Sequence, residues 1–162
     1  MSVRIDVIVA SPLWSRTPEA EDAVMKAIAA SETYFEPQDA EVSVLLCDDD
    51  EIRRLNARWR GQDAATNVLS FPPAGQNAAE RHLGDIAISY QTLAREASDE
   101  RKMILHHLSH LTAHGYLHLL GFDHETDDEA EEMEDLERKI LADLGIGDPY
   151  GSTVAGQDQG AR

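Results

Sequence analysis

Residues 104–124 of this 162-residue chain read ILHHLSHLTAHGYLHLLGFDH. Apolar side chains recur on more than one face of a helix drawn through this stretch, at Ile104, Leu105, Leu108, Leu111, Leu117 and Leu119. A helix that is apolar around most of its surface must be covered on several sides. The sequence therefore predicts a central, largely buried helix from about Asp99 to Leu120. Ser98 and the two acids that follow it offer the chemistry of a helix start, and Gly121 ends the helix.

Four other stretches have the alternation or the short apolar run of a β-strand: Val3–Val9, Val42–Cys47, Asn67–Pro72 and Leu83–Ser89. Helical periodicity lies between and after them. The last helix is expected to start at a capping box formed by Thr126 and Glu129 and to stop at Gly145. Strands interleaved with helices in a chain of this length predict a single α/β domain.

The composition excludes several classes of protein. There are 31 Asp and Glu against 14 Lys and Arg, a formal charge of −17, so a uniformly basic surface that coats nucleic acid is ruled out. Cys47 is the single cysteine, so no internal disulfide is available to a secreted fold. No stretch reaches the roughly 18 apolar residues of a membrane span, and the charged start lacks the apolar run of a signal peptide. We expect a cytoplasmic protein that contacts no membrane.

The charge is unevenly distributed along the chain. Twelve acids and two bases lie in residues 123–148, and we interpret these acids as the solvated face of the last helix. Four arginines lie within eight positions with no acid among them: Arg53, Arg54, Arg58 and Arg60. Arginine suits phosphate because its planar guanidinium offers paired donors and a permanent charge. The alternative interpretation is a helix surface whose arginines pair with nearby acids.

Six of the seven histidines lie between residues 106 and 124, and three of them have the spacing of metal ligands. His114 and His118 are one helical turn apart on one face, and a turn at Gly121 allows His124 to return to the same point. Three neutral imidazoles suit zinc and leave a fourth coordination position for water, the arrangement of catalytic zinc sites. A metal-free histidine cluster and a structural site closed by a fourth ligand are the two alternatives.

The same H-x-x-x-H-x-x-G-x-x-H spacing occurs in the metzincin proteases, which need a glutamate after the first histidine as general base. Gly115 occupies that position here, so peptide hydrolysis is not expected. Hydrolysis of another substrate at zinc remains, and Arg60 is a candidate to stabilise the charge on a phosphoryl group. No general base is evident, because Asp123 and Glu125 are near the histidines only in sequence.

The segment from His114 to His124 resembles the signature of the YbeY family of bacterial rRNA maturation factors. Three further blocks resemble shared stretches of that family, in the same order: Leu55-Asn56-x-x-Trp59-Arg60, Thr66 to Pro72, and Leu83-Gly84-Asp85-Ile86. The resemblance extends over roughly Val3 to Leu144. It implies an α/β fold in which a small four-stranded mixed sheet is packed with about five helices.

The resemblance also implies roles for single residues. It places one Zn²⁺ per chain on His114, His118 and His124, and it implies a required arginine at Arg60. Asp85 belongs to a shared block, but no role is assigned to it. His110 is expected to orient a metal ligand. We expect His106 and His107 to be surface or packing residues.

The function implied by the family is single-strand-specific, metal-dependent endoribonuclease activity, which we place in 16S rRNA 3′-end maturation and ribosome quality control. The expected partners are single-stranded rRNA and the small ribosomal subunit or one of its proteins. The alternatives are a non-catalytic ribosome-assembly factor with a structural zinc and a zinc hydrolase of another phosphoester or amide. We assign residues 1–148 to the zinc-dependent hydrolase domain and expect residues 149–162 to be a disordered tail.

Overall fold

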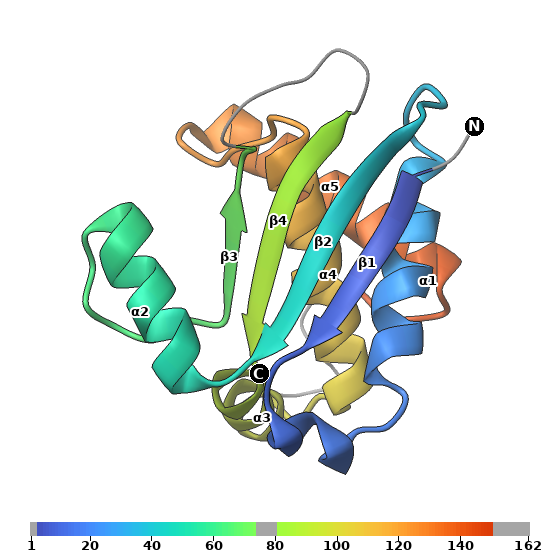
Figure 1. Ribbon diagram of the computed structural model, residues 1–162. Helices are drawn as coiled ribbons and strands as arrows, with labels where there is room; N and C mark the ends of the chain where they lie inside the picture. The colour runs from blue at the N-terminus through green and yellow to red at the C-terminus, as the bar shows by residue number, and fades with distance from the viewer. Residues whose placement is uncertain (1–2, 74–80, 151–162) are drawn as a thin grey trace.

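The sheet of the computed structural model, which describes residues 3–73 and 81–150, has four strands in the order β1-β2-β4-β3 (Figure 1). β1 (Val3–Val9), β2 (Ala40–Cys47) and β4 (His82–Ser89) are parallel, and β3 (Val68–Phe71) pairs antiparallel with β4. The predicted mixed four-stranded sheet is confirmed. The predicted strand ends agree with the observed ones to within two residues.

Five α-helices surround this sheet, as expected, together with a short 3₁₀ helix. Their bounds are Pro12–Arg16 for the 3₁₀ helix η1, Ala20–Glu32 for α1, Asp49–Arg60 for α2, Tyr90–Asp99 for α3, Ile104–Leu119 for α4 and Asp127–Asp143 for α5. α5 starts at the predicted capping box, in which Thr126 and Glu129 exchange side-chain-to-backbone hydrogen bonds. Within the described ranges, no helix combines the length and the apolarity that a bilayer crossing requires.

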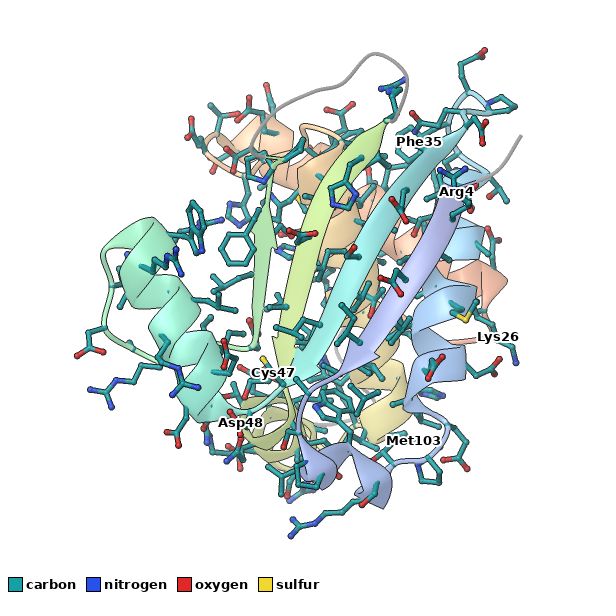
Figure 2. All side chains as sticks on the ribbon, viewed as in Figure 1. Arg4, Lys26, Phe35, Cys47, Asp48 and Met103 are labelled. Atoms are coloured by element: carbon teal, nitrogen blue, oxygen red, sulfur yellow. The ribbon has the colours of Figure 1, made fainter. Side chains whose placement is uncertain are left out.

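The two faces of the sheet are covered differently. Val42, Val44 and Leu46 of β2 point into the main core, together with apolar side chains of α1 and α4. The intervening Leu45 points to the opposite face, where α2 is the one helix of the described residues that packs, through Ile52 and its neighbours. Figure 1 shows α1, α4 and α5 behind the sheet and α2 beside β3 on the other side. Figure 2 shows where α2 departs, at Cys47 and Asp48. Part of one sheet face is therefore left without a helix.

α4 is the central helix that residues 104–124 predict. It packs against α1, α3, α5, β3 and β4. Leu108, Leu111 and Leu117 are all buried, as expected for a helix that is apolar on several faces. Each buried leucine contributes about 1.5–3 kcal/mol of transfer free energy, so the packing around α4 holds its position firmly.

The predicted start of this helix is wrong. Ser98 and Asp99 end α3, and α4 begins at Ile104. Between them Arg101 has a left-handed backbone with φ of 56°, and the amide of Lys102 donates to the carbonyl of Ala97. This arrangement closes a helix C-terminus. A hydroxyl followed by two acids is typical of a helix start, but here a backbone reversal two residues later makes the same stretch an end.

Gly84 sets how closely α4 approaches the sheet. Its φ is +141°, and a Cβ there would lie 2.4 Å from the carbonyl oxygen of Phe71 and 2.7 Å from Cδ2 of Leu119. The position also follows a register shift between β2 and β4. Only glycine fits without displacing β3 or the end of α4 that carries the histidines.

We expect Gly84→Ala to lower the free energy of unfolding by about 2–5 kcal/mol, from the combined cost of overpacking and a strained φ. Urea denaturation of the two proteins measures this difference. Gly147→Ala is the matched control, because a Cβ at Gly147 meets nothing within 4 Å. Equal stability of Gly84→Ala and wild type would contradict the close approach of α4 to β3 and β4.

Candidate metal centre

Three histidines come together at the C-terminal end of α4. His114 and His118 lie one turn apart on this helix, and His124 lies in the loop that follows it. Gly121 has a φ of +101°, and its amide donates to the carbonyl of His118, so the chain turns back immediately after the helix. Each histidine offers one ring nitrogen, and these three atoms lie within 4.8 Å of one another.

Hydrogen-bond acceptors beside the imidazoles of His114 and His118 determine which ring nitrogen of each faces the centre. The Nδ1–H of His114 donates to Oε2 of Glu137 at 2.8 Å, and the Nδ1–H of His118 donates to the carbonyl of Phe122 at 3.0 Å. Both rings therefore present Nε2 to the centre, and these two nitrogens are 3.1 Å apart. Two lone pairs at that distance repel each other unless a proton or a cation lies between them.

The electrostatics keep His118 in the form that binds metals. Burial lowers the pKa of His118, and the neighbouring His114 and His124 lower it further. A metal ligand must be a neutral imidazole, so a lowered pKa removes the competition from a proton near neutral pH. The three rings are therefore placed as metal ligands require, and His118 is held in the neutral form.

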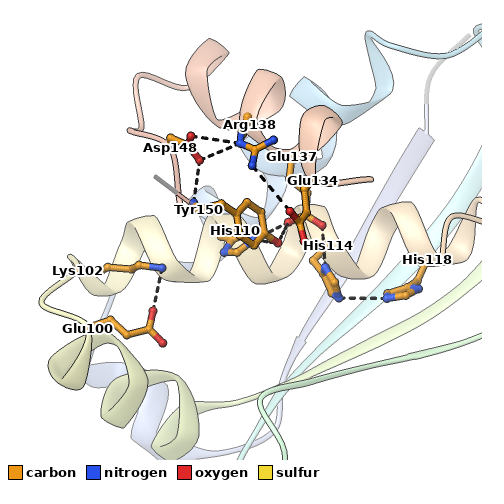
Figure 3. Close-up of polar contacts among 10 residues, drawn as sticks. All are labelled: Glu100, Lys102, His110, His114, His118, Glu134, Glu137, Arg138, Asp148 and Tyr150. Carbon is orange, nitrogen blue, oxygen red and sulfur yellow. Dashed lines mark hydrogen bonds and ion pairs between the residues drawn. The ribbon is translucent and has the colours of Figure 1, made fainter. Parts of the chain in front are cut away.

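Glu137 of α5 is the residue of this site that the sequence analysis missed. The charge pattern predicts that Glu137 lies on the solvated face of the last helix. This prediction is wrong, because the side chain is 0% exposed. Figure 3 shows it between α5 and α4, where His110 and His114 both point at its carboxylate. The signal was present in the sequence, since position 137 shares a helix face with the buried Met133 and Ile140.

The carboxylate of Glu137 is satisfied from three directions. In addition to His114, the Nε2–H of His110 donates to Oε1 at 2.6 Å and the hydroxyl of Tyr150 donates to the same oxygen at 2.5 Å. Burial alone would raise the pKa of Glu137, but the hydrogen bonds from His110 and His114 outweigh it and hold the pKa at about 2. Glu137 is thus a buried anion that orients His114, and His110 acts on the centre through it.

The structure also places the remaining histidines and the start of the predicted tail. His107 is buried and donates to Glu96 at 2.8 Å, which is a packing role, and His106 is half-buried.

Tyr150, which belongs to the predicted tail, contacts Glu137 and His110. Residues 151–162 of that expected tail lie outside the described residues.

Arg60 and the three histidines line one cavity of about 610 Å³ between α2, β3 and the end of α4. Arg60 ends α2, where Gly61 provides a left-handed cap. Its guanidinium donates to the backbone carbonyl of Ser70 at 3.0 Å, and the Ser70 hydroxyl donates to the carbonyl of Gly115 at 2.9 Å. Ser70 therefore links the arginine to the helix turn that carries His114.

The four neighbouring arginines differ in their partners. Arg53 makes two hydrogen bonds to the carboxylate of Asp63, and Arg54 pairs with Glu51, so these two follow the surface alternative. Among the described residues, neither Arg58 nor Arg60 pairs with a carboxylate. A guanidinium without a carboxylate partner, in the same cavity as three imidazoles, can take a phosphate oxygen.

The chemistry available at this centre is limited by Gly115. A Cβ at this position would lie 3.0 Å from Cγ2 of Ile86 and 3.1 Å from the hydroxyl of Ser70. A side chain at this position would therefore begin against the sheet, where a glutamate does not fit without displacing its neighbours. This packing explains why the general base of the metzincin proteases cannot occupy the corresponding position.

The donor set fits a metal ion with an open coordination position. Three imidazole nitrogens are a ligand set that catalytic zinc sites use, and two of the rings here have their tautomers fixed by hydrogen bonds. Within residues 3–73 and 81–150, the group of His, Cys, Asp and Glu that can hold one ion has these three members. The Asp123 carboxylate does not belong to this group; its Oδ1 lies 3.6 Å from Nδ1 of His124.

Comparison with known proteins relates the chain to one family. The family model described as Endoribonuclease YbeY matches residues 13–145. A curated Endoribonuclease YbeY of a Bradyrhizobium species is 56% identical, over 90% of this chain and 90% of the relative. Another, from Rhodopseudomonas palustris, is 54% identical over 95% of this chain and 82% of the relative. A solution structure of a Thermotoga maritima protein aligns with a TM-score of 0.48 at 26% identity, covering 93% of this chain and 99% of that one.

Proposed function

Because this chain belongs to the YbeY family of endoribonucleases, we propose that it cuts single-stranded RNA at a zinc centre on His114, His118 and His124. The observation that carries the proposal is the shared cavity. It is lined by the three imidazoles and by Arg60, which pairs with no carboxylate among the described residues. The cellular task we propose is maturation of the 3′ end of 16S rRNA, together with ribosome quality control.

The ligand set supports zinc, with one ion per chain. Imidazole is a ligand that zinc favours, and an all-oxygen set would instead suit magnesium or calcium. When bound, zinc would polarise a phosphate oxygen or lower the pKa of a coordinated water molecule to about 7. The protein's own part is to orient two of the three rings, His114 through Glu137 and His118 through the Phe122 carbonyl.

Arg60 has the position and the charge to hold the scissile phosphate. Its guanidinium keeps further N–H donors beyond the one used on Ser70, and they can bind two phosphate oxygens together. The negative charge on the phosphoryl group grows during the reaction, so a fixed cation beside it lowers the barrier. The link through Ser70 to Gly115 keeps this cation at a constant place relative to His114.

Two nucleophiles are compatible with this geometry. Attack by the 2′-hydroxyl of the substrate expels the 5′-oxygen and leaves a 2′,3′-cyclic phosphate, whereas attack by water leaves a phosphate monoester on one RNA end and a hydroxyl on the other. Neither route uses a general base from the position of Gly115, which the sheet fills. Identification of the terminal group on the product distinguishes the two routes.

The strong negative charge of the chain favours binding to its RNA through a protein of the ribosome rather than directly. With a formal charge of −17, the chain lacks the broad basic surface that drives autonomous RNA affinity. The first turns of α5 expose a run of acids, from Asp127 to Glu132, that complements a basic ribosomal protein. We therefore propose the small ribosomal subunit, in the cytoplasm, as the place of action.

Cleavage assays on two matched substrates test this function. We expect the zinc-loaded protein to cut a defined single-stranded RNA and to leave the same sequence intact in a duplex. A chelator should abolish cleavage, and added zinc should restore it. If the protein holds one zinc tightly but cuts neither RNA, alone or with small subunits, it is a non-catalytic assembly factor and the proposal is wrong.

A further inference from the structure

A second cavity, of about 670 Å³, lies on the sheet face that only α2 covers. Its walls are largely apolar and come from β1, β2, β4, α2 and β3, with Ile8, Leu45, Leu55, Trp59 and Phe71 among them. We call this cavity the α2 cleft. Its size is that of a site for a small organic group, and it is separate from the main core behind the sheet.

Two features of the α2 cleft are unusual for a part of the surface without a ligand. Trp59 is 60% exposed and Ile8 is 47% exposed, although both are large apolar side chains. The Trp59 and Phe71 rings are tilted by 54° with centroids 6.2 Å apart, so two aromatic faces border the same space. Exposed apolar surface bordered by polar groups marks binding sites.

The α2 cleft adjoins the metal cavity. Arg60, Ser70 and Pro72 line both of them. The guanidinium of Arg58 lies 5.5 Å from the centre of the Trp59 ring, which places a second cation beside the aromatic wall. A ligand in the α2 cleft would thus have Arg60 between it and the histidines.

We propose that the α2 cleft is a nucleobase site, in which an unpaired base next to the scissile phosphate of the RNA stacks on Trp59. This inference rests on the proposed function, because it takes the phosphate at Arg60 as its starting point. Every nucleobase offers an apolar π face, and stacking on aromatic side chains is how proteins hold single strands. The sugar and phosphate that join the base to the cut position then meet Arg60, which lines both cavities.

The chemistry of the α2 cleft favours a base over other parts of the RNA. Asp85 lines the cleft and carries an exposed carboxylate, which repels phosphate but accepts from the amino group of a base. A base held in a duplex is stacked and paired, so it cannot enter. The cleft therefore supplies the selectivity for single strands, a task that the metal centre does not perform by itself.

The binding test uses the fluorescence of Trp59. The chain has two tryptophans, and Trp14 is 3% exposed, so an external ligand acts on Trp59. We expect a single-stranded 2′-O-methyl RNA to quench the zinc-loaded protein and the matching duplex to leave it unchanged. Trp59→Ala should remove this quenching. Absence of quenching by the single strand would overturn the proposal.

The cleavage test combines the protein variant with altered substrates. We expect Trp59→Ala to raise KM for a short single-stranded RNA about 5- to 100-fold with little change in kcat. An abasic residue at one position beside the cut should raise the KM of wild type similarly and should have no further effect on Trp59→Ala. Trp59→Phe should keep most of the affinity. Met103→Ala is the control, because Met103 (Figure 2) is 63% exposed yet lines neither cavity.

The outcomes separate this inference from the proposed function. Normal cleavage by wild type, with no effect of Trp59→Ala or of any abasic position, overturns the base site and leaves the nuclease intact. Quenching that depends on Trp59 and on single strands, without cleavage by wild type, supports the base site although the proposed cleavage fails.

Discussion

Replacing Arg60 by alanine is expected to slow RNA cleavage about 100- to 1,000-fold, the usual cost of removing one charge-stabilising donor from an active site. The structure gives the reason: within the described residues, Arg60 is the guanidinium that shares a cavity with the three histidines, and Ser70 fixes its position. The metal ligands lie on other elements, so the metal content should not change. Single-turnover cleavage rates and metal analysis of the purified variant measure both quantities.

Two further variants make this result specific. Arg60→Lys retains the charge but loses the paired donors, so an intermediate rate is expected. Arg53→Ala removes an arginine of the same helix that is exposed and paired with Asp63, and it should cleave RNA like wild type. If Arg60→Ala cuts at the wild-type rate, or if it fails only because it has lost its metal, the role assigned to Arg60 is wrong.

Substitution of Glu137 is expected to affect the metal more than any other change outside the three histidines. Glu137→Gln leaves one acceptor oxygen for His110, His114 and Tyr150, so one donor must face an amide N–H₂ instead. Loss of such an orienting partner typically lowers metal affinity about 10- to 100-fold. Competition with a zinc indicator measures the affinity directly, without any reference to activity.

Glu137→Ala should add a cost in stability, because it leaves two half-buried imidazoles without their acceptor. Removal of one member of a buried charged network typically lowers the free energy of unfolding by about 3–5 kcal/mol. Glu134→Gln is the matched control: it lies on the same helix, is half-exposed and only approaches Arg138 at 3.8 Å. Wild-type zinc affinity in Glu137→Gln would show that the carboxylate does not orient His114.

The central helix and the meeting of the three histidines follow from local rules and could be predicted. The apolar side chains of residues 104–119 surround the helix axis, so the burial of the helix can be predicted without knowing which elements cover it. His114 and His118 are related by one helical turn, and Gly121 has the conformation that turns the chain back toward them. In these cases, sequence separation alone determines where the side chains go.

Features that depend on contacts between distant elements could not be predicted in the same way. Glu137 is one of twelve acids in residues 123–148. It becomes a buried partner of His114 because α5 packs beside α4. The end of α3 depends on the reversal at Arg101, for which the sequence offers no glycine. The α2 cleft exists because α2 covers only part of the sheet, a matter of packing rather than of pattern.

The identity of the first coordination shell tests the central claim most directly. X-ray absorption spectroscopy of the zinc-loaded protein at neutral pH should give three histidine nitrogens at about 2.0–2.1 Å and one oxygen from solvent. His118→Ala should reduce the histidine count or abolish binding. A shell of four protein ligands, or a zinc site that retains its spectrum when His114 and His118 are both replaced, would contradict an open, three-histidine centre.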